Sequence, residues 1–240
     1  MALMEYDPQV VFRTLDSFDA RALLGLGIGS LAYYVQYVSN IRVGFRERTH
    51  ATPVVANMWN FADDVTYLLM FGRWFHDDRF SHWFTQAMWF GFIAWAAMEG
   101  ITHYQTIRFS LGELFKGMPR RSALTLYIGA QATLLALFLF LKASVDDPIW
   151  LFMIATTQFS SIAFCIPMLL QRGSARGLSM TSARALMIAP AAFLCLFLPA
   201  VAPNFDQWPT YGAGVACIAV GFAYVRLLGR MKNKPAGSHP

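Results

Sequence analysis

Residues 124–141 read LTLYIGAQATLLALFLFL, a stretch of 18 residues that contains no charged side chain. A helix needs about 20 predominantly apolar residues to cross the hydrocarbon core of a bilayer, so this stretch predicts a transmembrane helix. Six more apolar segments of similar length occur along the chain. The seven expected spans are Ala20–Asn40, Pro53–Phe71, Trp83–His103, Leu124–Leu141, Pro148–Leu170, Arg184–Ala202 and Pro209–Leu228.

The composition of the whole chain supports the same class. Of its 240 residues, 56% are hydrophobic and 14% are charged, against roughly 25% charged in an average soluble domain. The mean hydropathy is +0.42. Disordered chains, collagens and nucleic-acid-binding arrays are excluded, because their compositions are polar or repetitive. We therefore predict an all-α, multi-pass integral membrane protein with seven transmembrane helices, placed in the plasma membrane of a bacterium or the endoplasmic reticulum of a fungus.

The distribution of charge predicts how the chain is oriented. The segments after the first, third, fifth and seventh spans hold fourteen of the nineteen basic residues and only two acids, Glu47 and Glu113. The opposite side holds five basic residues and nine acids. Because Lys and Arg concentrate on the cytoplasmic side, we expect the N-terminus outside and the C-terminus in the cytoplasm. The net charge of +5 is then an orientation signal with contacts to anionic membrane lipids, and it requires no nucleic-acid partner.

The chain is expected to form one membrane domain. We divide it into a polar lead-in at residues 1–19, a seven-helix domain at 20–229 and a basic tail at 230–240. A weak internal similarity relates Gln36–Asn57 to Pro167–Leu186, since in each case a basic loop joins one helix to the next. This similarity makes a three-plus-one-plus-three arrangement of helices one option, as in sugar-transporter-like and PQ-loop folds.

Three acids fall inside the expected spans, namely Asp63, Asp64 and Glu99. An ionisable side chain in hydrocarbon costs several kcal/mol, at least about 2.5 on the most lenient scale, so it normally faces a cavity and has a function. Asp64 shares a helical face with Asn60 and Tyr67, and we expect Asn60 to hydrogen-bond with it. Asp63 points about 100° away from this face, which makes Asp64 the better functional candidate.

Glu99 and His103 form a second intramembrane pair, four residues apart, and Tyr104 follows the histidine. A carboxyl group held away from water keeps a proton available near neutral pH, which is what a general acid in an apolar pocket requires. The side chains of Trp59, Tyr67, Trp95 and Tyr104 could line an apolar cavity near the acids. A purely structural role, in which the acids tie helices together by hydrogen bonds, is the alternative.

Metal and cofactor chemistry have little support in the sequence. His76, Asp77, Asp78 and His82 could hold a metal ion, but a solvated loop between helices is the better explanation for them. No DDxxD or DxDD pattern occurs. The three cysteines, at positions 165, 195 and 217, lie in apolar spans without the spacing of metal ligands. We therefore expect no metal and no cofactor.

Two stretches of the chain resemble the membrane-integrated terpene cyclases of meroterpenoid biosynthesis, the pyripyropene and indole-diterpene type. Phe45-Arg-Glu-Arg-Thr-His-Ala-Thr-Pro53, followed by Asn60-Phe-Ala-Asp-Asp-Val-Thr-Tyr67, is similar to that family's Arg-Asp-Arg-Thr-Tyr loop and Asn-Phe-Ala-Trp-Glu-x-x-Tyr helix. Leu169-Leu-Gln-Arg-Gly-Ser-Ala-Arg-Gly-Leu-Ser179 is similar to its Leu-Leu-x-Arg-Gly-Ser-Ser-Arg-Gly-x-Ser stretch. Length, number of spans and motif order agree over nearly the whole chain.

The resemblance implies an activity and a role for Asp64. In that family a carboxylate at this position is implicated in protonating the substrate, often a terminal epoxide. Here the residue is Asp instead of Glu, and Asp63 replaces the preceding Trp. A second family acid lies in the last span, where this chain has Gly221; Glu99 is a candidate replacement.

We thus expect a lipophilic prenylated substrate to enter a cavity among the helices laterally from the bilayer. Asp64, positioned by Asn60, would protonate an epoxide or an alkene, and aromatic side chains would shield the resulting cation. Glu99 or His103 would take the final proton.

Two other functions remain open at this stage. A small-solute transporter of the PQ-loop or sugar-transporter kind would account for the seven spans. However, Val35-Gln36 and Pro167-Met168 stand where the PQ dipeptides would be, and all three membrane acids lie in the first half of the chain. The third alternative is a non-enzymatic membrane protein that binds lipids or a partner.

Overall fold

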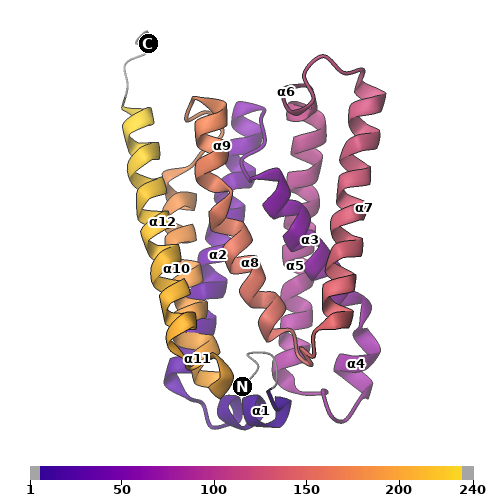
Figure 1. Cartoon of the computed structure of the whole chain (residues 1–240), viewed down its shortest axis with the longest axis vertical. Helices are drawn as coiled ribbons and strands as arrows, with labels where there is room; N and C mark the ends of the chain where they lie inside the picture. Colours follow the sequence, from indigo (N-terminus) through magenta and orange to yellow (C-terminus); the bar gives the residue numbers. More distant parts are fainter. Residues whose placement is uncertain (1–5, 234–240) are drawn as a thin grey trace.

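The computed structural model describes residues 6–233, and it is helical throughout, with no strand in that range (Figure 1). Residues 1–5 of the expected lead-in and 234–240 of the expected basic tail lie outside the described part. The helices are α1 (Pro8–Asp16), α2 (Ala20–Glu47), α3 (Val54–Leu69), α4 (Phe71–His76), α5 (Trp83–Gln105), α6 (Leu111–Leu114), α7 (Arg120–Ser144), α8 (Leu151–Ala163), α9 (Cys165–Arg172), α10 (Met180–Ala192), α11 (Leu198–Val201) and α12 (Trp208–Lys232). Thr106–Ser110 and Phe193–Phe197 are π-helical turns, and Pro203–Phe205 is a 3₁₀ turn.

Every expected span is helical. The first four and the seventh correspond to α2, α3, α5, α7 and α12, and the other two correspond to α8–α9 and α10–α11. Four of these helical stretches, α7, α8–α9, α10–α11 and α12, are long and apolar enough to cross a membrane by length and composition. Of the remaining three, α3 has only 16 residues, and α2 and α5 carry polar side chains that lower their mean hydropathy.

The helix pair α8–α9 is broken at Phe164, within the fifth expected span. Pro167 has no backbone N–H, so it cannot donate to the carbonyl of Ala163, the last residue of α8. The sequence pattern predicts one continuous helix here, because proline interrupts the hydrogen bonding of a helix without changing its hydrophobic periodicity.

The long helices run up and down the bundle, and the connections between them gather at its two ends (Figure 1). The end that carries α6, α9 and the last turn of α12 holds the basic connections. The opposite end holds α1, α4 and α11, together with the acidic connections. The charge separation predicted from the sequence is therefore built into one bundle, although its orientation in the membrane stays a prediction.

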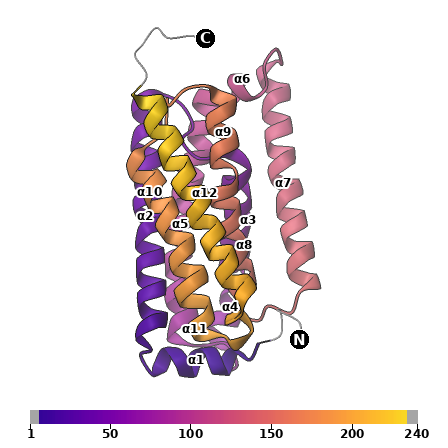
Figure 2. The ribbon, with the colours of Figure 1, turned by 60° about the vertical axis from the view of Figure 1, so that its left-hand side comes forward.

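Helix α7 stands at the outside of the bundle, beside α3 (Figures 1 and 2). Only 11% of its most apolar window is buried against the rest of the protein. A helix that is hydrophobic all round and so exposed needs an apolar surrounding to cover it, which lipid provides.

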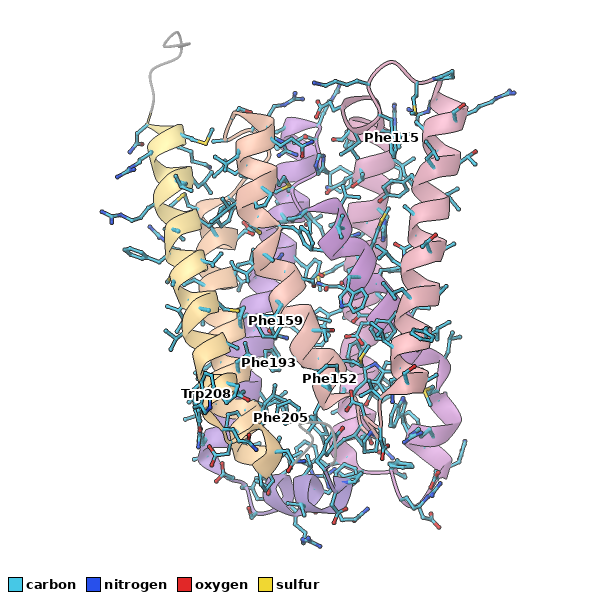
Figure 3. All side chains as sticks on the ribbon, in the orientation of Figure 1. Phe115, Phe152, Phe159, Phe193, Phe205 and Trp208 are labelled. Atoms are coloured by element: carbon cyan, nitrogen blue, oxygen red, sulfur yellow. The ribbon has the colours of Figure 1, made fainter. Side chains whose placement is uncertain are left out.

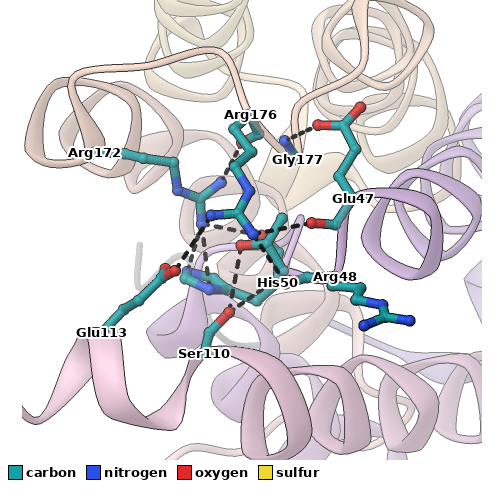
Figure 4. A network of polar contacts seen from close by, with 9 residues as sticks. Glu47, Arg48, His50, Ser110, Glu113, Arg172, Arg176 and Gly177 are labelled. Atoms are coloured by element: carbon teal, nitrogen blue, oxygen red, sulfur yellow. Dashed lines mark hydrogen bonds and ion pairs between the residues drawn. The ribbon is translucent and has the colours of Figure 1, made fainter.

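A polar network fixes the basic end of the bundle (Figure 4). Arg172, at the end of α9, donates from Nη2 to the carbonyl of His50 at 3.0 Å and from Nη1 to the carbonyl of Arg176 at 2.8 Å. Gly177 has a φ of +75° and donates its backbone N–H to Glu47 Oε2 at 2.5 Å. The two stretches that are weakly similar in sequence, Gln36–Asn57 and Pro167–Leu186, thus pack directly against each other.

We expect His50 to make the stability of this network depend on pH. Burial, and secondly the charge of Arg172, lowers the pKa of His50 from 6.5 to about 3. The pKa of His50 is lower in the folded state than in the unfolded state. The contribution of His50 to the free energy of unfolding is therefore fully present above about pH 6.5 and is lost as the pH falls. We expect a loss of about 1.4 kcal/mol per pH unit below that point.

The substitution His50→Gln removes the titrating group and keeps an acceptor for Arg172. Unfolding midpoints of both proteins in detergent at pH 7.5 and 5.5 test this expectation. The wild type is expected to lose more stability than the variant between these values. An equal loss in both proteins would show that His50 does not cause the acid sensitivity.

Candidate active site

A cavity of about 40 Å³ lies among α2, α3, α5, α8 and the π-helical turn after α10. Its lining residues are Tyr33, Tyr37, Asn60, Asp63, Asp64, Met88, Phe92, Trp95, Glu99, Ile154, Thr157, Gln158 and Phe193. The volume holds about one or two water molecules. The lining side chains therefore have to move apart before a prenyl chain can enter.

Asp64 from α3 and Glu99 from α5 meet in this cavity. Both side chains are buried, and their carboxyl groups are within hydrogen-bonding reach of each other. Asp64 Oδ2 and Glu99 Oε2 are buried and have no hydrogen-bond partner among the described residues. Two carboxyl groups in contact repel each other when both are ionised, so the pair is stable only when at least one of them keeps its proton. The arrangement can therefore hold a transferable proton in an apolar cavity.

Tyr37 and Asn60 support the carboxyl pair from the side. The Tyr37 hydroxyl donates to Glu99 Oε1 at 2.5 Å, and Asn60 Nδ2 donates to the Tyr37 oxygen at 3.3 Å and to Ser161 Oγ at 3.1 Å. The expected hydrogen bond from Asn60 to Asp64 is not among the contacts of these side chains. Asn60 instead reaches the acids indirectly, through Tyr37 and Glu99.

Asp63 faces the same cavity with a different partner. Its Oδ1 accepts a hydrogen bond of 2.8 Å from the indole N–H of Trp150, which precedes α8. The 100° between consecutive helical positions predicts the different partners of Asp63 and Asp64. It does not predict that both line one cavity, because that depends on how widely the cavity wraps around α3.

Aromatic and apolar side chains form the rest of the wall. Trp95 and Phe92 come from α5, and Phe193 opens the π-helical turn after α10 (Figure 3). The ring of Phe193 packs directly over Gly29 of α2, where an added Cβ would lie 2.6 Å from a ring carbon. The cavity is thus apolar except where the acids, amides and tyrosines enter it.

A family model described as Pyr4-like transmembrane terpene cyclases matches residues 20–225. The chain belongs to this family. It is therefore a membrane terpene cyclase, as the resemblance of its two stretches implies. The chain has no match among curated proteins and none among solved structures.

Four residues expected near the acids of the cyclase lie outside the cavity lining. His103 Nδ1 is 2.6 Å from the hydroxyl of Tyr127 on α7, and Tyr104 is 53% exposed. Trp59 donates from its indole to Thr156 Oγ1 at 3.0 Å, and Tyr67 donates to the Thr85 carbonyl at 3.0 Å. Of the expected aromatic wall of the cyclase, Trp95 alone lines the cavity.

Several lining residues of the cyclase are absent from the sequence-based prediction. Tyr33 and Tyr37 lie four residues apart on α2, and Gln158 accepts a hydrogen bond from Tyr33 at 2.7 Å. A search for uncharged polar side chains at helical spacing could have found them, since a buried amide inside an apolar span also needs a partner.

Gly221 stands where the resemblance implies a second acid, and the structure shows how this position is packed. A Cβ at Gly221 would lie 2.9 Å from Met187, so this position of α12 packs closely on α10. No residue of α12 is among those that line the cavity. The carboxyl groups that line the cavity beside Asp64 are those of Asp63 on α3 and Glu99 on α5.

The cyclase has no group of three or more His, Cys, Asp or Glu side chains placed to hold a metal, as far as residues 6–233 are concerned. In the loop that contains His76, Asp77, Asp78 and His82, side chains contact other protein groups. Asp77 pairs with Arg79 at 3.1 Å, and His82 stacks on Phe12 and contacts Asp16 at 3.0 Å.

Proposed function

We propose that Asp64 protonates a lipophilic prenylated substrate, at a terminal epoxide or an alkene, and that the cavity guides the resulting cation through cyclisation. The observation that carries this proposal is the contact between Asp64 and Glu99 inside one cavity with an aromatic wall. A structural tie between two helices would not need an aromatic cavity at the same place.

The chemistry balances without a cofactor. Asp64 gives its proton to the epoxide oxygen or to an alkene carbon, and the positive charge of the resulting cation offsets the two carboxylates beside it. Glu99 later takes up the final proton and returns it to Asp64. The cation moves along the polyene as each new carbon–carbon bond forms, beside the π faces of Trp95, Phe92 and Phe193. A proton then leaves a carbon next to the last cation. The product is an isomer of the substrate.

The final base is Glu99 in this proposal. Glu99 lines the cavity, whereas His103, the other candidate from the sequence, lies against Tyr127 and outside the lining. The indole N–H of Trp95 is buried without a partner in the described part of the chain. It is a donor that a substrate oxygen could use.

A lateral path from the bilayer fits the crevice between α2 and α5. Tyr34 of α2 stacks on Trp95 of α5 with 5.3 Å between ring centroids, and its hydroxyl contacts the Gly91 carbonyl at 3.4 Å. Trp95 lines the cavity, and Tyr34 lines a groove on the outer surface. This aromatic pair thus lies between the residues that line the cavity and those that line the outer groove.

We also propose that the chain crosses the membrane seven times, with the N-terminus outside and the C-terminus in the cytoplasm. The basic connections, which lie together at one end of the bundle, support this topology.

Conversion of a substrate by membranes that contain the chain distinguishes a cyclase from a carrier. The membranes are incubated with prenylated aromatic compounds, with and without a terminal epoxide. We expect a product of unchanged mass that contains at least one new carbocycle. Uptake of a solute into vesicles, without conversion of any prenylated compound, would instead favour the transporter.

A further inference from the structure

A second concave surface lies at the basic end of the bundle, away from the cavity. It is a groove of about 560 Å³ along α2, bordered by the start of α10 and the last turn of α12. These three helices run side by side at this end (Figure 2). We call it the α2 groove. Apart from Tyr34, which stacks on Trp95 of the cavity wall, its lining residues have no role in the proposed chemistry.

One end of the α2 groove is cationic. Arg42, Arg46 and Lys232 line it, and no acidic residue does. Arg42 and Lys232 have neither a hydrogen bond nor an ion pair from their side chains to other residues between 6 and 233. Arg46 Nη2 forms an ion pair with Glu47 Oε1 at 2.7 Å, and the Arg46 side chain is 70% exposed. Two unpaired cations and a third, partly paired one therefore converge on one surface.

The other end of the α2 groove is apolar. Arg46, Arg42, Val38 and Tyr34 are each four residues apart, so they follow one stripe along α2. Four residues advance a helix by about 6 Å, which places Tyr34 roughly 18 Å from Arg46. Val35 and Val38 are 39% and 41% exposed along the way. The stripe thus changes from cationic to apolar over the length of a phospholipid headgroup and the upper part of its chain.

From this geometry we propose that the α2 groove binds an anionic phospholipid. The headgroup phosphate contacts Arg42, Arg46 and Lys232, and one acyl chain lies over Val38 toward Tyr34. The hydroxyls of Ser39 and Ser179, 2.6 Å apart, stand beside the cations as further donors. The basic end is the one expected in the cytoplasm, where the membrane leaflet is anionic. Because Tyr34 stacks on Trp95, the bound chain touches the aromatic pair that lies between the groove and the cavity.

The test measures lipid binding, so it does not depend on the proposed chemistry. Purified full-length chain is titrated with phosphatidylglycerol or phosphatidylcholine, and bound lipid is counted by native mass spectrometry. In the double variant Arg42→Gln/Lys232→Gln we expect at least fivefold weaker binding of phosphatidylglycerol. The matched control is Arg108→Gln/Arg121→Gln, which removes two exposed charges at the same end outside the groove. It is expected to bind phosphatidylglycerol like the wild type.

A second variant, Val38→Trp, fills the apolar part without changing charge, and we expect it also to weaken phosphatidylglycerol binding. Equal phosphatidylglycerol binding by the wild type and by both groove variants would overturn the proposal. Binding of phosphatidylcholine as tight as that of phosphatidylglycerol would also overturn it. So would displacement of the bound lipid by inorganic phosphate at a concentration similar to that of the lipid. The last result would indicate a site for free anions.

Discussion

The variant Asp64→Asn is expected to lose at least about 10³-fold of the turnover, within the 10²–10⁴-fold range of general acid catalysis. Asparagine has nearly the same shape as aspartate, but its amide cannot deliver a proton. The measurement is the rate of product formation per mole of purified protein. Comparable unfolding midpoints of variant and wild type would show that the loss arises in the chemistry.

The matched control for this variant is Asp64→Glu. It restores a carboxyl group at the same position and matches the residue that the family carries there. We expect it to keep a measurable part of the activity, because its extra methylene shifts the acid without removing it. Full turnover by Asp64→Asn would rule out Asp64 as the acid.

Replacing Glu99 with Gln is expected to lower turnover by about 10²-fold or more. The glutamine amide can still contact Asp64 and Tyr37, but it can neither share a proton with Asp64 nor accept the final one. The matched control is His103→Gln, one helical turn further along α5 and outside the cavity lining. We expect this control to retain most of the activity.

The double variant Asp64→Asn/Glu99→Gln distinguishes a coupled pair from two independent residues. If the two carboxyl groups act as one unit, the double variant is no slower than Asp64→Asn alone. A further loss that multiplies the two single losses would contradict a shared role. A loss in His103→Gln equal to that in Glu99→Gln would return the histidine to the mechanism.

The helices could be predicted from the sequence because membrane helices carry their signal locally. Segments such as Leu124–Leu141 need only their own length and hydrophobicity to be recognised. The observed α7 extends this segment by a few residues at each end, to Arg120 and Ser144. The polar N-terminal lead-in contains a short helix, α1, that is not among the helices expected from the sequence. Its buried face includes Val11, Phe12 and Leu15.

The candidate active site could be predicted only in part. The cost of burying a carboxyl group in a membrane is a property of the residue, so Asp63, Asp64 and Glu99 stood out in the sequence. Which of them touch is set by how α3 packs on α5, and no local pattern contains that information. His103 illustrates the limit. It follows Glu99 by four residues, yet it points to Tyr127 on α7.

The most direct test of the central claim compares wild type and Asp64→Asn on one substrate. Both are purified, reconstituted in lipid and given an epoxidised prenylated aromatic compound that the wild type converts. The product is analysed by mass spectrometry and NMR. We expect the wild type to form a product of the substrate's mass with at least one new carbocycle, and the variant to return the substrate unchanged. An isomer with the same new rings formed at the same rate by Asp64→Asn would contradict the account.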